Sequence, residues 1–444
     1  MSIRDRVTSP ARAVTRWGLG HALPSTAMAG RARRGDLQAR GMQASRESQV
    51  LPLDLFDEIR AAGPFYRGHF AWTTARHAVV RETLTSPDVQ VGIGLPADTA
   101  LARLFRWGVS AAPKGPLEPP SLLATEPPDH TRMRKLVTRV FTVRAVQRLQ
   151  TRTEEVAAGL LDDIAAASAA AGGRPVDLID GYAALLPVTV ICEILGVPAH
   201  ERDVVRHFGA AVAPSLDIGL SLPEFLRVER GLREFDRWLQ DHVEAVRRAP
   251  GDDLLSELVA ARDDDGSALS DDELIATAGL VLAAGFETTV NLIGSGVALL
   301  AEHPEQRKAL LAGDASWGRA VDEVLRYDPP VLLTGRTVAR DTEIAGTPLR
   351  RGAVVTTVLA AANRDPEVFA DPHRFDVTRE NAGEHLSFSG GRHYCLGAAL
   401  ARMEGEVALR ALHERYPDLA VAQGAERRRT RILRGYERLP VALV

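Results

Sequence analysis

Residues 385–412, HLSFSGGRHYCLGAALARMEGEVALRAL, carry one of only two cysteines in the chain, Cys395. Apolar residues recur every three or four positions from Leu396 onward, so a helix is predicted to begin immediately after this cysteine. A thiol at the start of a helix lies near the positive end of the helix dipole, which lowers its pKa and favours the thiolate. Cys395 is therefore either a small buried apolar residue or a thiolate that binds a metal or attacks a substrate.

The residues around Cys395 favour a metal. Gly391 and Gly397 remove side chains where a flat, bulky group could approach the backbone. One thiolate without a local cluster of histidines or acids fits a zinc site poorly. A haem iron with a single proximal thiolate fits this arrangement well.

The pattern F-x-x-G-x-H-x-C-x-G over residues 388–397 resembles the haem-binding loop of the cytochrome P450 monooxygenases. Ser389 departs from it, because bacterial members usually have Gly directly after Phe388. The resemblance implies a mainly α fold with a smaller β-rich region (α+β). It also implies one haem b (iron protoporphyrin IX) with Cys395 as the axial ligand of its iron, and contacts to the haem from Phe388, Gly391 and Gly397. Three further motifs follow in the family's order.

The first motif is VDEVLRYDPP, residues 321–330, in which Glu323 and Arg326 are three residues apart on one helix. An acid–base pair at this spacing is usually a surface pair worth a few tenths of a kcal/mol. The resemblance implies a buried, structural ion pair instead, which also engages Arg374 in the stretch DPHRFD.

The second motif is LAAGFETT, residues 282–289, within a long apolar helix. Ala284 and Gly285 are small enough to let a flat cofactor approach the helix backbone. A threonine here could simply donate its hydroxyl to its own helix. The resemblance implies that Glu287 and Thr288 form an acid–alcohol pair, in which Thr288 holds dioxygen and an ordered water while Glu287 relays protons.

The third motif is EPPDHTRMRKLV, residues 126–137, in which His130 and Arg134 are four residues apart. Such a pair could belong to a solvated basic helix face. Haem carries two propionates, and buried carboxylates need cationic or donor partners. The resemblance implies that His130 and Arg134 serve this purpose together with Arg336 and His393.

The resemblance also implies the reaction and its partners. One oxygen atom of dioxygen would hydroxylate or epoxidise an apolar small molecule, such as a lipid, terpene, steroid or polyketide-like compound. No flavin or nicotinamide fingerprint is visible, so a separate ferredoxin and its reductase are expected to supply electrons. The expected pocket residues are Val281, Ala284, Val331, Leu332 and Leu333.

Composition sets the remaining expectations. The chain has 444 residues, 45% hydrophobic and 25% charged, which is typical of a soluble globular protein. Two cysteines exclude a disulfide scaffold and favour a reducing, cytoplasmic setting, and Cys192 is interpreted as a packing residue. The longest nearly apolar run, residues 274–286, is shorter than a membrane span. We expect a monomer without a transmembrane segment or a nucleic-acid partner.

Residues 1–50 contain nine arginines against three acids, although the whole chain has a net charge of −4. Such a segment could contact acidic partners, a membrane surface or nucleic acid, but a solvated tail is the expectation. We therefore predict a basic N-terminal arm, partly ordered at most, followed by a single haem-thiolate domain over residues 51–444.

Two other classes of protein share the Cys395 loop. A peroxide-driven haem-thiolate peroxygenase could dispense with redox partners, and a haem-thiolate sensor or carrier would bind without turnover. The retained Glu287-Thr288 pair disfavours both, because neither needs a proton relay to cleave dioxygen.

Overall fold

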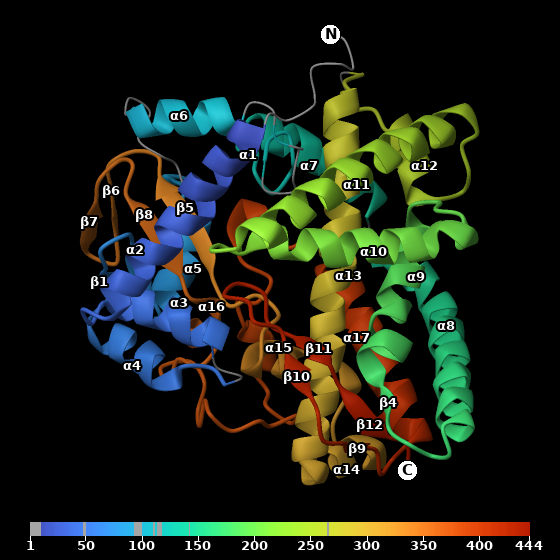
Figure 1. Ribbon diagram of the computed structural model, residues 1–444. Coiled ribbons are helices and arrows are strands. Elements are labelled where there is room, and N and C mark those ends of the chain that lie inside the picture. Colours follow the sequence, from blue (N-terminus) through green and yellow to red (C-terminus); the bar gives the residue numbers. More distant parts are fainter. Residues whose placement is uncertain are drawn as a thin grey trace.

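Helices make up most of the chain in the computed structural model, and most of the strands lie to one side of them (Figure 1). The structure describes residues 10–47, 50–92, 100–109, 112, 118–141, 143–263 and 266–444. The helices are α1 (Pro10–Trp17), α2 (Leu23–Ala32), α3 (Leu37–Glu47), α4 (Leu53–Ala61), α5 (His77–Thr85), α6 (Ala100–Val109), α7 (Asp129–Val140), α8 (Val143–Ala170), α9 (Leu185–Ile194), α10 (Arg202–Val212), α11 (Leu222–Arg248), α12 (Leu254–Ala260), α13 (Asp271–Glu302), α14 (Pro304–Ala312), α15 (Trp317–Tyr327), α16 (Leu359–Ala362) and α17 (Ala398–Arg415).

The strands form one five-stranded sheet and three smaller ones. The large sheet has the order β1-β2-β8-β5-β3, and only the β2–β8 pair is parallel. The smaller sheets have the orders β4-β12-β9, β10-β11 and β6-β7. The strands are β1 (Tyr66–Arg67), β2 (Trp72–Thr74), β3 (Val89–Val91), β4 (Val176–Asp177), β5 (Thr334–Val338), β6 (Thr342–Ile344), β7 (Thr347–Leu349), β8 (Val354–Thr357), β9 (Ala420–Val421), β10 (Glu426–Arg427), β11 (Tyr436–Arg438) and β12 (Pro440–Ala442). The predicted mainly α fold with a smaller β-rich region is confirmed.

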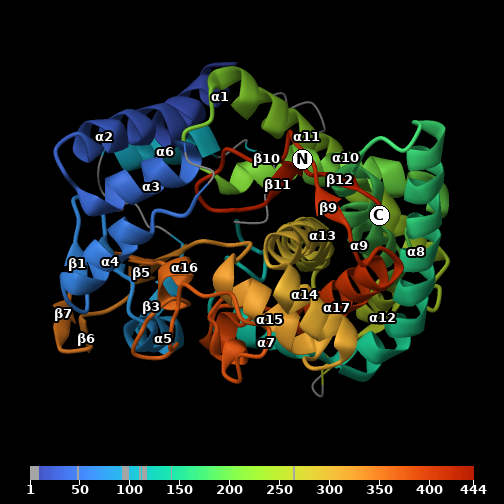
Figure 2. The same cartoon turned by 90° about the horizontal axis from the view of Figure 1, so that it is seen from below.

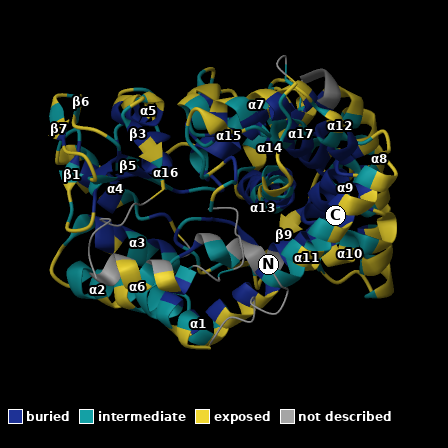
Figure 3. Cartoon of the chain, turned by 90° about the horizontal axis from the view of Figure 1, so that it is seen from above, coloured by how far each residue is buried: buried dark blue, intermediate teal, exposed yellow. Residues whose placement is uncertain are grey.

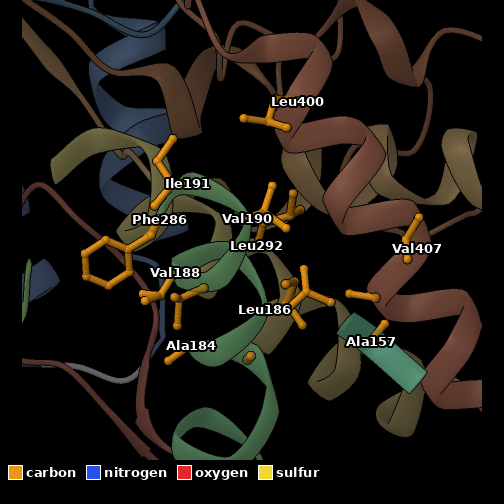
Figure 4. Close-up of a cluster of buried hydrophobic side chains, with 14 of the residues drawn as sticks. Ala157, Ala184, Leu186, Val188, Val190, Ile191, Phe286, Leu292, Leu400 and Val407 are labelled. Atoms are coloured by element: carbon orange, nitrogen blue, oxygen red, sulfur yellow. The ribbon is translucent and has the colours of Figure 1, made fainter. Parts of the chain in front are cut away.

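Helix α13 is the central element of the helical part. It begins with a capping box in which the Ser270 hydroxyl accepts from the Glu273 N–H and the Glu273 carboxylate accepts from the Ser270 N–H. Its apolar residues pack against α9 and α17, where Leu186, Ile191 and Leu400 form one cluster with Leu292 (Figure 4). Among the described helices, α13 alone has the length and apolar character of a membrane span, and most of it is buried inside the protein.

Burial follows this arrangement. Buried residues gather around α13, while outer helices such as α8 expose one face to solvent (Figure 3). The Cys395 loop lies just before α17, and α17 packs on α13, α15 and α8. The fold therefore brings the sequence around Cys395 to the middle of α13.

The N-terminal segment differs from the expected, partly ordered tail. Residues 10–47 form α1, the π-helical turn η2 (Gly18–Ala22), α2 and α3, and these helices pack against the rest of the protein. The arm runs along one edge, where α1 meets α11 (Figure 2). The two arginines of α1 have partners elsewhere in the chain: Arg16 pairs with Glu229, and Arg12 lies over the Trp107 ring. The high arginine content therefore does not prevent α1 from packing on the rest of the protein. Residues 1–9 and 48–49 of the predicted arm lie outside the described residues.

Candidate active site

A cavity of about 300 Å³ lies between the middle of α13 and the Cys395 loop. Its wall is mostly apolar, and it places Cys395 and Thr288 on the same cavity. The lining residues are Leu122, Leu123, Arg134, Phe141, Ile191, Leu280, Val281, Ala284, Gly285, Thr288, Thr289, Leu292, Leu325, Pro330, Val331, Thr334, Leu359, Ser387, Phe388, Ser389, His393, Tyr394, Cys395, Leu396, Gly397, Leu400, Ala401 and Glu404.

The loop before Cys395 is held by its own backbone. The Cys395 N–H donates to the Phe388 carbonyl at 2.9 Å. Ser389 has a φ of 62°, a left-handed conformation that non-glycine residues rarely adopt. The resembling loops have Gly at this position because glycine enters that region without steric cost.

The two glycines of the motif, Gly391 and Gly397, lack a side chain for different structural reasons. Gly391 has a φ of 63°, and an added Cβ would lie 2.6 Å from the Leu84 carbonyl oxygen at the end of α5. This corrects the expectation for Gly391, which fits the loop to α5 and does not line the cavity. At Gly397 an added Cβ would meet nothing within 4 Å, so its missing side chain leaves open space at the cavity wall.

Cys395 lines this cavity and is exposed in the haem-free chain. Burial raises its pKa, while the Gly397 N–H and the nearby Arg134 and Arg402 act in the opposite direction. The expected lowering of the thiol pKa at the helix start is present, because Gly397 is the N-cap of α17, but burial outweighs it in the protein alone. A thiol that coordinates a metal is deprotonated by the metal itself.

On the opposite wall, Ala284 and Thr288 face the cavity from α13. The Thr288 hydroxyl donates to the Ala284 carbonyl at 3.0 Å, and the next residue, Thr289, donates to the Gly285 carbonyl at 3.1 Å. Gly285 differs from the prediction in its main contact, because an added Cβ would lie 3.1 Å from the Ile191 side chain on α9. Its small size therefore serves helix packing as well as the cavity wall.

Glu287 points away from the cavity. Its side chain is buried and forms an ion pair with Arg428, which follows β10. Burial lowers the pKa of Arg428. The predicted pair Glu287 and Thr288 therefore lies on adjacent faces of α13, with the acid held by the C-terminal segment and the alcohol in the cavity.

Four predicted donors gather at one end of the cavity. Arg134 and His393 line it, and the His393 ring lies 4.4 Å from the His130 ring between centroids. The Nε2 atoms of both histidines have no hydrogen-bond partner among the described residues. Arg336 on β5 does not line the cavity itself, but it donates to the hydroxyl of the lining residue Ser389 at 3.4 Å.

Burial disfavours the charged forms of this donor cluster, although Glu126 lies 3.4 Å from His393 Nε2. Burial lowers the pKa of His393 to about 4, helped by the neighbouring His130 and opposed by Glu126. Burial likewise lowers the pKa of Arg336 to about 10 and that of His130. A group with two carboxylates would satisfy the orphaned nitrogens and restore the charge balance.

The cavity therefore fits a haem by three independent features. Cys395 offers one thiolate, Gly397 leaves open space beside it, and the donor cluster suits two propionates. A zinc site is not supported, since the described residues hold no group of three or more His, Cys, Asp or Glu that could bind a metal. The other cysteine, Cys192, is fully buried, and burial raises its pKa to about 12.

The predicted structural ion pair is buried. Arg326 donates from Nε and Nη2 to both carboxylate oxygens of Glu323 at 2.7 and 2.8 Å, and both side chains are inaccessible to solvent. Arg374 contributes only its backbone carbonyl to Arg326, and its side chain is exposed. The second arginine that pairs with Glu323 is Arg379, at 3.3 Å. The expected role of Arg374 in this ion pair is therefore wrong.

The predicted pocket residues divide in two. Val281, Ala284 and Val331 line the cavity. Leu332 is buried in a separate cluster near α4, and Leu333 does not line the cavity either. The reason is the backbone bond from the Leu332 N–H to the Ile432 carbonyl, at 2.8 Å, which fixes this turn against the C-terminal segment.

Sequence reasoning missed Glu404, which lines the cavity from α17. It is fully buried, and burial raises its pKa well above the usual range, while the Thr289 hydroxyl acts in the opposite direction. A charged residue within the apolar spacing of α17 was the available signal. Besides Glu287, which points away from the cavity, the site thus has Glu404, an acid in the cavity wall that can hold a proton.

Comparison with known proteins agrees with this geometry. The family model described as Cytochrome P450 matches residues 229–312 and 318–425. The chain is 48% identical over 420 residues to "Putative cytochrome P450 140" of Mycobacterium tuberculosis, covering 93% of each protein. It is 44% identical over 324 residues to the 6-deoxyerythronolide B hydroxylase of Saccharopolyspora erythraea, covering 72% of this chain and 77% of that protein.

Solved structures share the whole architecture. The crystal structure of P450BioI in complex with an acyl carrier protein ligated to hexadec-9Z-enoic acid superimposes with a TM-score of 0.79 at 31% identity. The match covers 90% of this chain and all of that one. The fold of this chain thus has a counterpart among solved cytochrome P450 structures.

Proposed function

The chain belongs to the cytochrome P450 family. On this premise we propose that it is a monooxygenase that hydroxylates or epoxidises an apolar small molecule. The observation that supports this most strongly is one apolar cavity that carries a single thiolate ligand, an alcohol on the facing helix and an orphaned donor cluster. No one of these features requires haem chemistry, but their combination suits it.

The residues of the cavity would have separate tasks. Haem, when bound, would supply the activation of dioxygen and the oxidant for the substrate. Cys395 would hold the iron as a thiolate and donate electron density to it. His130, Arg134, Arg336 and His393 would hold the propionates and so fix the orientation of the haem plane.

Protons would arrive from the α13 side. Thr288 would turn its hydroxyl from the Ala284 carbonyl toward the cavity and hold a water there. Glu287 is the neighbouring residue and is paired with Arg428. If its carboxylate left Arg428, it would be able to deliver a proton to that water. The apolar wall would exclude other water from the reacting atoms.

The substrate class follows from the wall and the relatives. The lining is dominated by Leu, Ile, Val and Phe, which suits an apolar ligand with few polar groups. One relative is named as a hydroxylase of 6-deoxyerythronolide B, which favours a polyketide-like compound within the wider set of lipids, terpenes and steroids. A ferredoxin with its reductase would supply the electrons to a monomeric, cytoplasmic protein.

Turnover with isotopically heavy dioxygen tests this function. Haem-loaded protein, ferredoxin, reductase and NADPH are incubated with compounds that shift the ferric spectrum. We expect one heavy oxygen atom in the product. A Thr288→Ala variant should release more peroxide for each electron pair and form less product, because the water that delivers protons is no longer held.

Two results would replace the proposal. Product formed from peroxide at the same rate, with none from dioxygen and ferredoxin, would indicate a peroxygenase. A compound that binds tightly but is never oxidised, whatever the electron donor, would indicate a sensor or carrier.

A further inference from the structure

The N-terminal arm bridges two distant parts of the molecule. It is defined here as residues 10–47, that is α1, η2, α2 and α3. One end packs on α6 and α11, and the other end packs on α4 beside the large sheet (Figure 2). The arm therefore spans from the helical side to the β-rich side of the protein.

At one end of the arm, a buried guanidinium joins α1 to α6 and α11, beside the buried Ala13 and the Arg12 guanidinium over the Trp107 ring. Arg16 of α1 is 5% exposed and donates from Nε to the Glu229 carboxylate of α11 at 2.8 Å. Its Nη1 donates to the Gly108 carbonyl of α6 at 2.6 Å. Arg16 thus joins α1, α6 and α11, which are far apart in sequence. Glu229 keeps a second partner, Arg233, at 2.8 Å.

The middle of the arm is attached mainly to one short connection. The Trp17 indole donates to the Leu220 carbonyl at 2.9 Å, and the Leu220 N–H donates to His21 Nδ1 at 3.3 Å. At the end of α3, Arg46 donates to the neighbouring Gly219 carbonyl at 3.4 Å. Both Gly219 and Leu220 belong to the connection between α10 and α11. In η2 and α2 no residue is buried, so apolar packing contributes little to this part.

The other end of the arm is anchored firmly. In α3 the buried Gln38 donates to the Thr356 hydroxyl of β8 at 3.0 Å, and the Leu37 N–H donates to the Tyr66 hydroxyl at 3.2 Å. Leu37 also packs on the cluster that contains Leu51. An arm with an apolar anchor at α3 and a polar fastening at α1 would detach first at α1.

The arm contacts α11, which packs on the cavity-lining helix α13. Residues 118–128 precede α7, and Leu122 and Leu123 among them line the cavity. Phe208 of α10 and Phe235 of α11 line a narrow crevice against α13, beside the cavity residues of that helix. Movement of α6 or of the α10–α11 connection would therefore change access to the cavity.

We propose that the N-terminal arm is a strap that closes the cavity on the side of α6 and α11, with the Arg16–Glu229 ion pair as its latch. Release of the latch frees α1, α6 and the α10–α11 connection together, and large ligands enter only then. Small ligands pass without it. The inference rests on the proposed function only in taking the cavity as the place where ligands reach the haem.

The test compares a small and a bulky iron ligand, imidazole and ketoconazole, by the rate at which each changes the spectrum of the ferric, haem-loaded protein. Arg16→Met should bind ketoconazole about tenfold faster or more, because the open state is more populated. Imidazole should change by less than about twofold. Arg40→Met is the matched control, since Arg40 lies on the same arm in an exposed pair with Glu58, 3.5 Å away.

Two further variants separate a latch from general destabilisation. Glu229→Gln removes the charge but keeps an acceptor, and should also speed ketoconazole binding. The double variant Arg16→Met/Glu229→Gln should be no faster than the faster single variant, because both remove one interaction. Hydrogen exchange should accelerate in α1 of each variant and stay slow in α3, a result that does not depend on haem.

Equal ketoconazole rates in the wild type, Arg16→Met and Arg40→Met would overturn the strap. So would an equal acceleration of both ligands, which would mean a loosened fold without size selection. Failure of the proposed function would look different, because dioxygen and ferredoxin would then give no oxidised product while both azoles still shifted the ferric spectrum of the wild-type protein.

Discussion

The imidazole rings of His130 and His393 lie with their centroids 4.4 Å apart, and neither Nε2 atom has a hydrogen-bond partner among the described residues. His393 Nε2 lies 3.4 Å from a Glu126 carboxylate oxygen, a contact longer than its best hydrogen-bond distance. Together with Arg134 and Arg336, the two histidines are the residues that we propose hold the haem propionates.

Removing one of these donors should weaken haem binding. We expect Arg336→Gln or His130→Gln to speed haem transfer to apomyoglobin by about 10- to 100-fold, the range seen when a supporting residue of a metal site is lost. The control is Arg350→Gln, since Arg350 is exposed on the β-rich side. Transfer rates equal to the control for both variants would contradict the assignment of the donor cluster.

Replacing Ser389 with glycine should relax the loop. Its φ of 62° costs a non-glycine residue about 1 kcal/mol, so Ser389→Gly should raise the free energy of unfolding of the haem-free protein by about that amount. Ser389→Ala keeps the strain and removes only the hydroxyl that accepts from Arg336. Urea unfolding compares the two, and a glycine variant no more stable than the alanine variant would show that the backbone is unstrained.

The buried ion pair predicts unequal roles for two neighbouring arginines. Arg379→Ala should lower the free energy of unfolding by about 2 kcal/mol, because it removes a charged partner of buried Glu323. Arg374→Ala should cost less than about 0.5 kcal/mol, as its side chain is exposed. Chemical denaturation measures the free energy of unfolding of both variants. A larger loss of stability in Arg374→Ala than in Arg379→Ala would assign Arg374 to the ion pair.

His413 should make stability depend on pH. It is buried on α17 against Trp317, and burial, helped by Arg307, lowers its pKa to about 3. In the unfolded chain its pKa is about 6.5. Between these values the unfolded state binds a proton that the folded state does not, so the free energy of unfolding falls as the pH falls, by at most about 1.4 kcal/mol per pH unit.

The His413→Phe variant should lose this slope between about pH 6.5 and pH 3 while keeping the stack on Trp317. His200, whose side chain is 81% exposed, provides the control variant His200→Phe. Unfolding free energies measured across this window would contradict the account if both variants kept the slope of the wild type.

The motifs and the fold class could be predicted from sequence because they rest on local spacing. The Cys395 pattern, the Glu323–Arg326 spacing and the capping box before α13 each occupy a few consecutive residues. The long apolar helix expected around residues 282–289 is α13, which runs from Asp271 to Glu302.

What the sequence did not predict depends on contacts between distant residues. Arg379, 56 residues from Glu323, pairs with that carboxylate and donates to the Asp371 carbonyl, while the Arg374 side chain is exposed. The thiol pKa of Cys395 depends on burial by the whole cavity, which no local pattern contains. The N-terminal arm is ordered because Arg16 finds Glu229, 213 residues away.

The carbon monoxide spectrum of the reduced, haem-loaded protein tests the central claim most directly. Thiolate ligation by Cys395 predicts an absorption band at about 450 nm, lost in a Cys395→Ser variant. A spectrum like that of a histidine-ligated haem, or a wild-type protein that takes up no haem, would contradict the account.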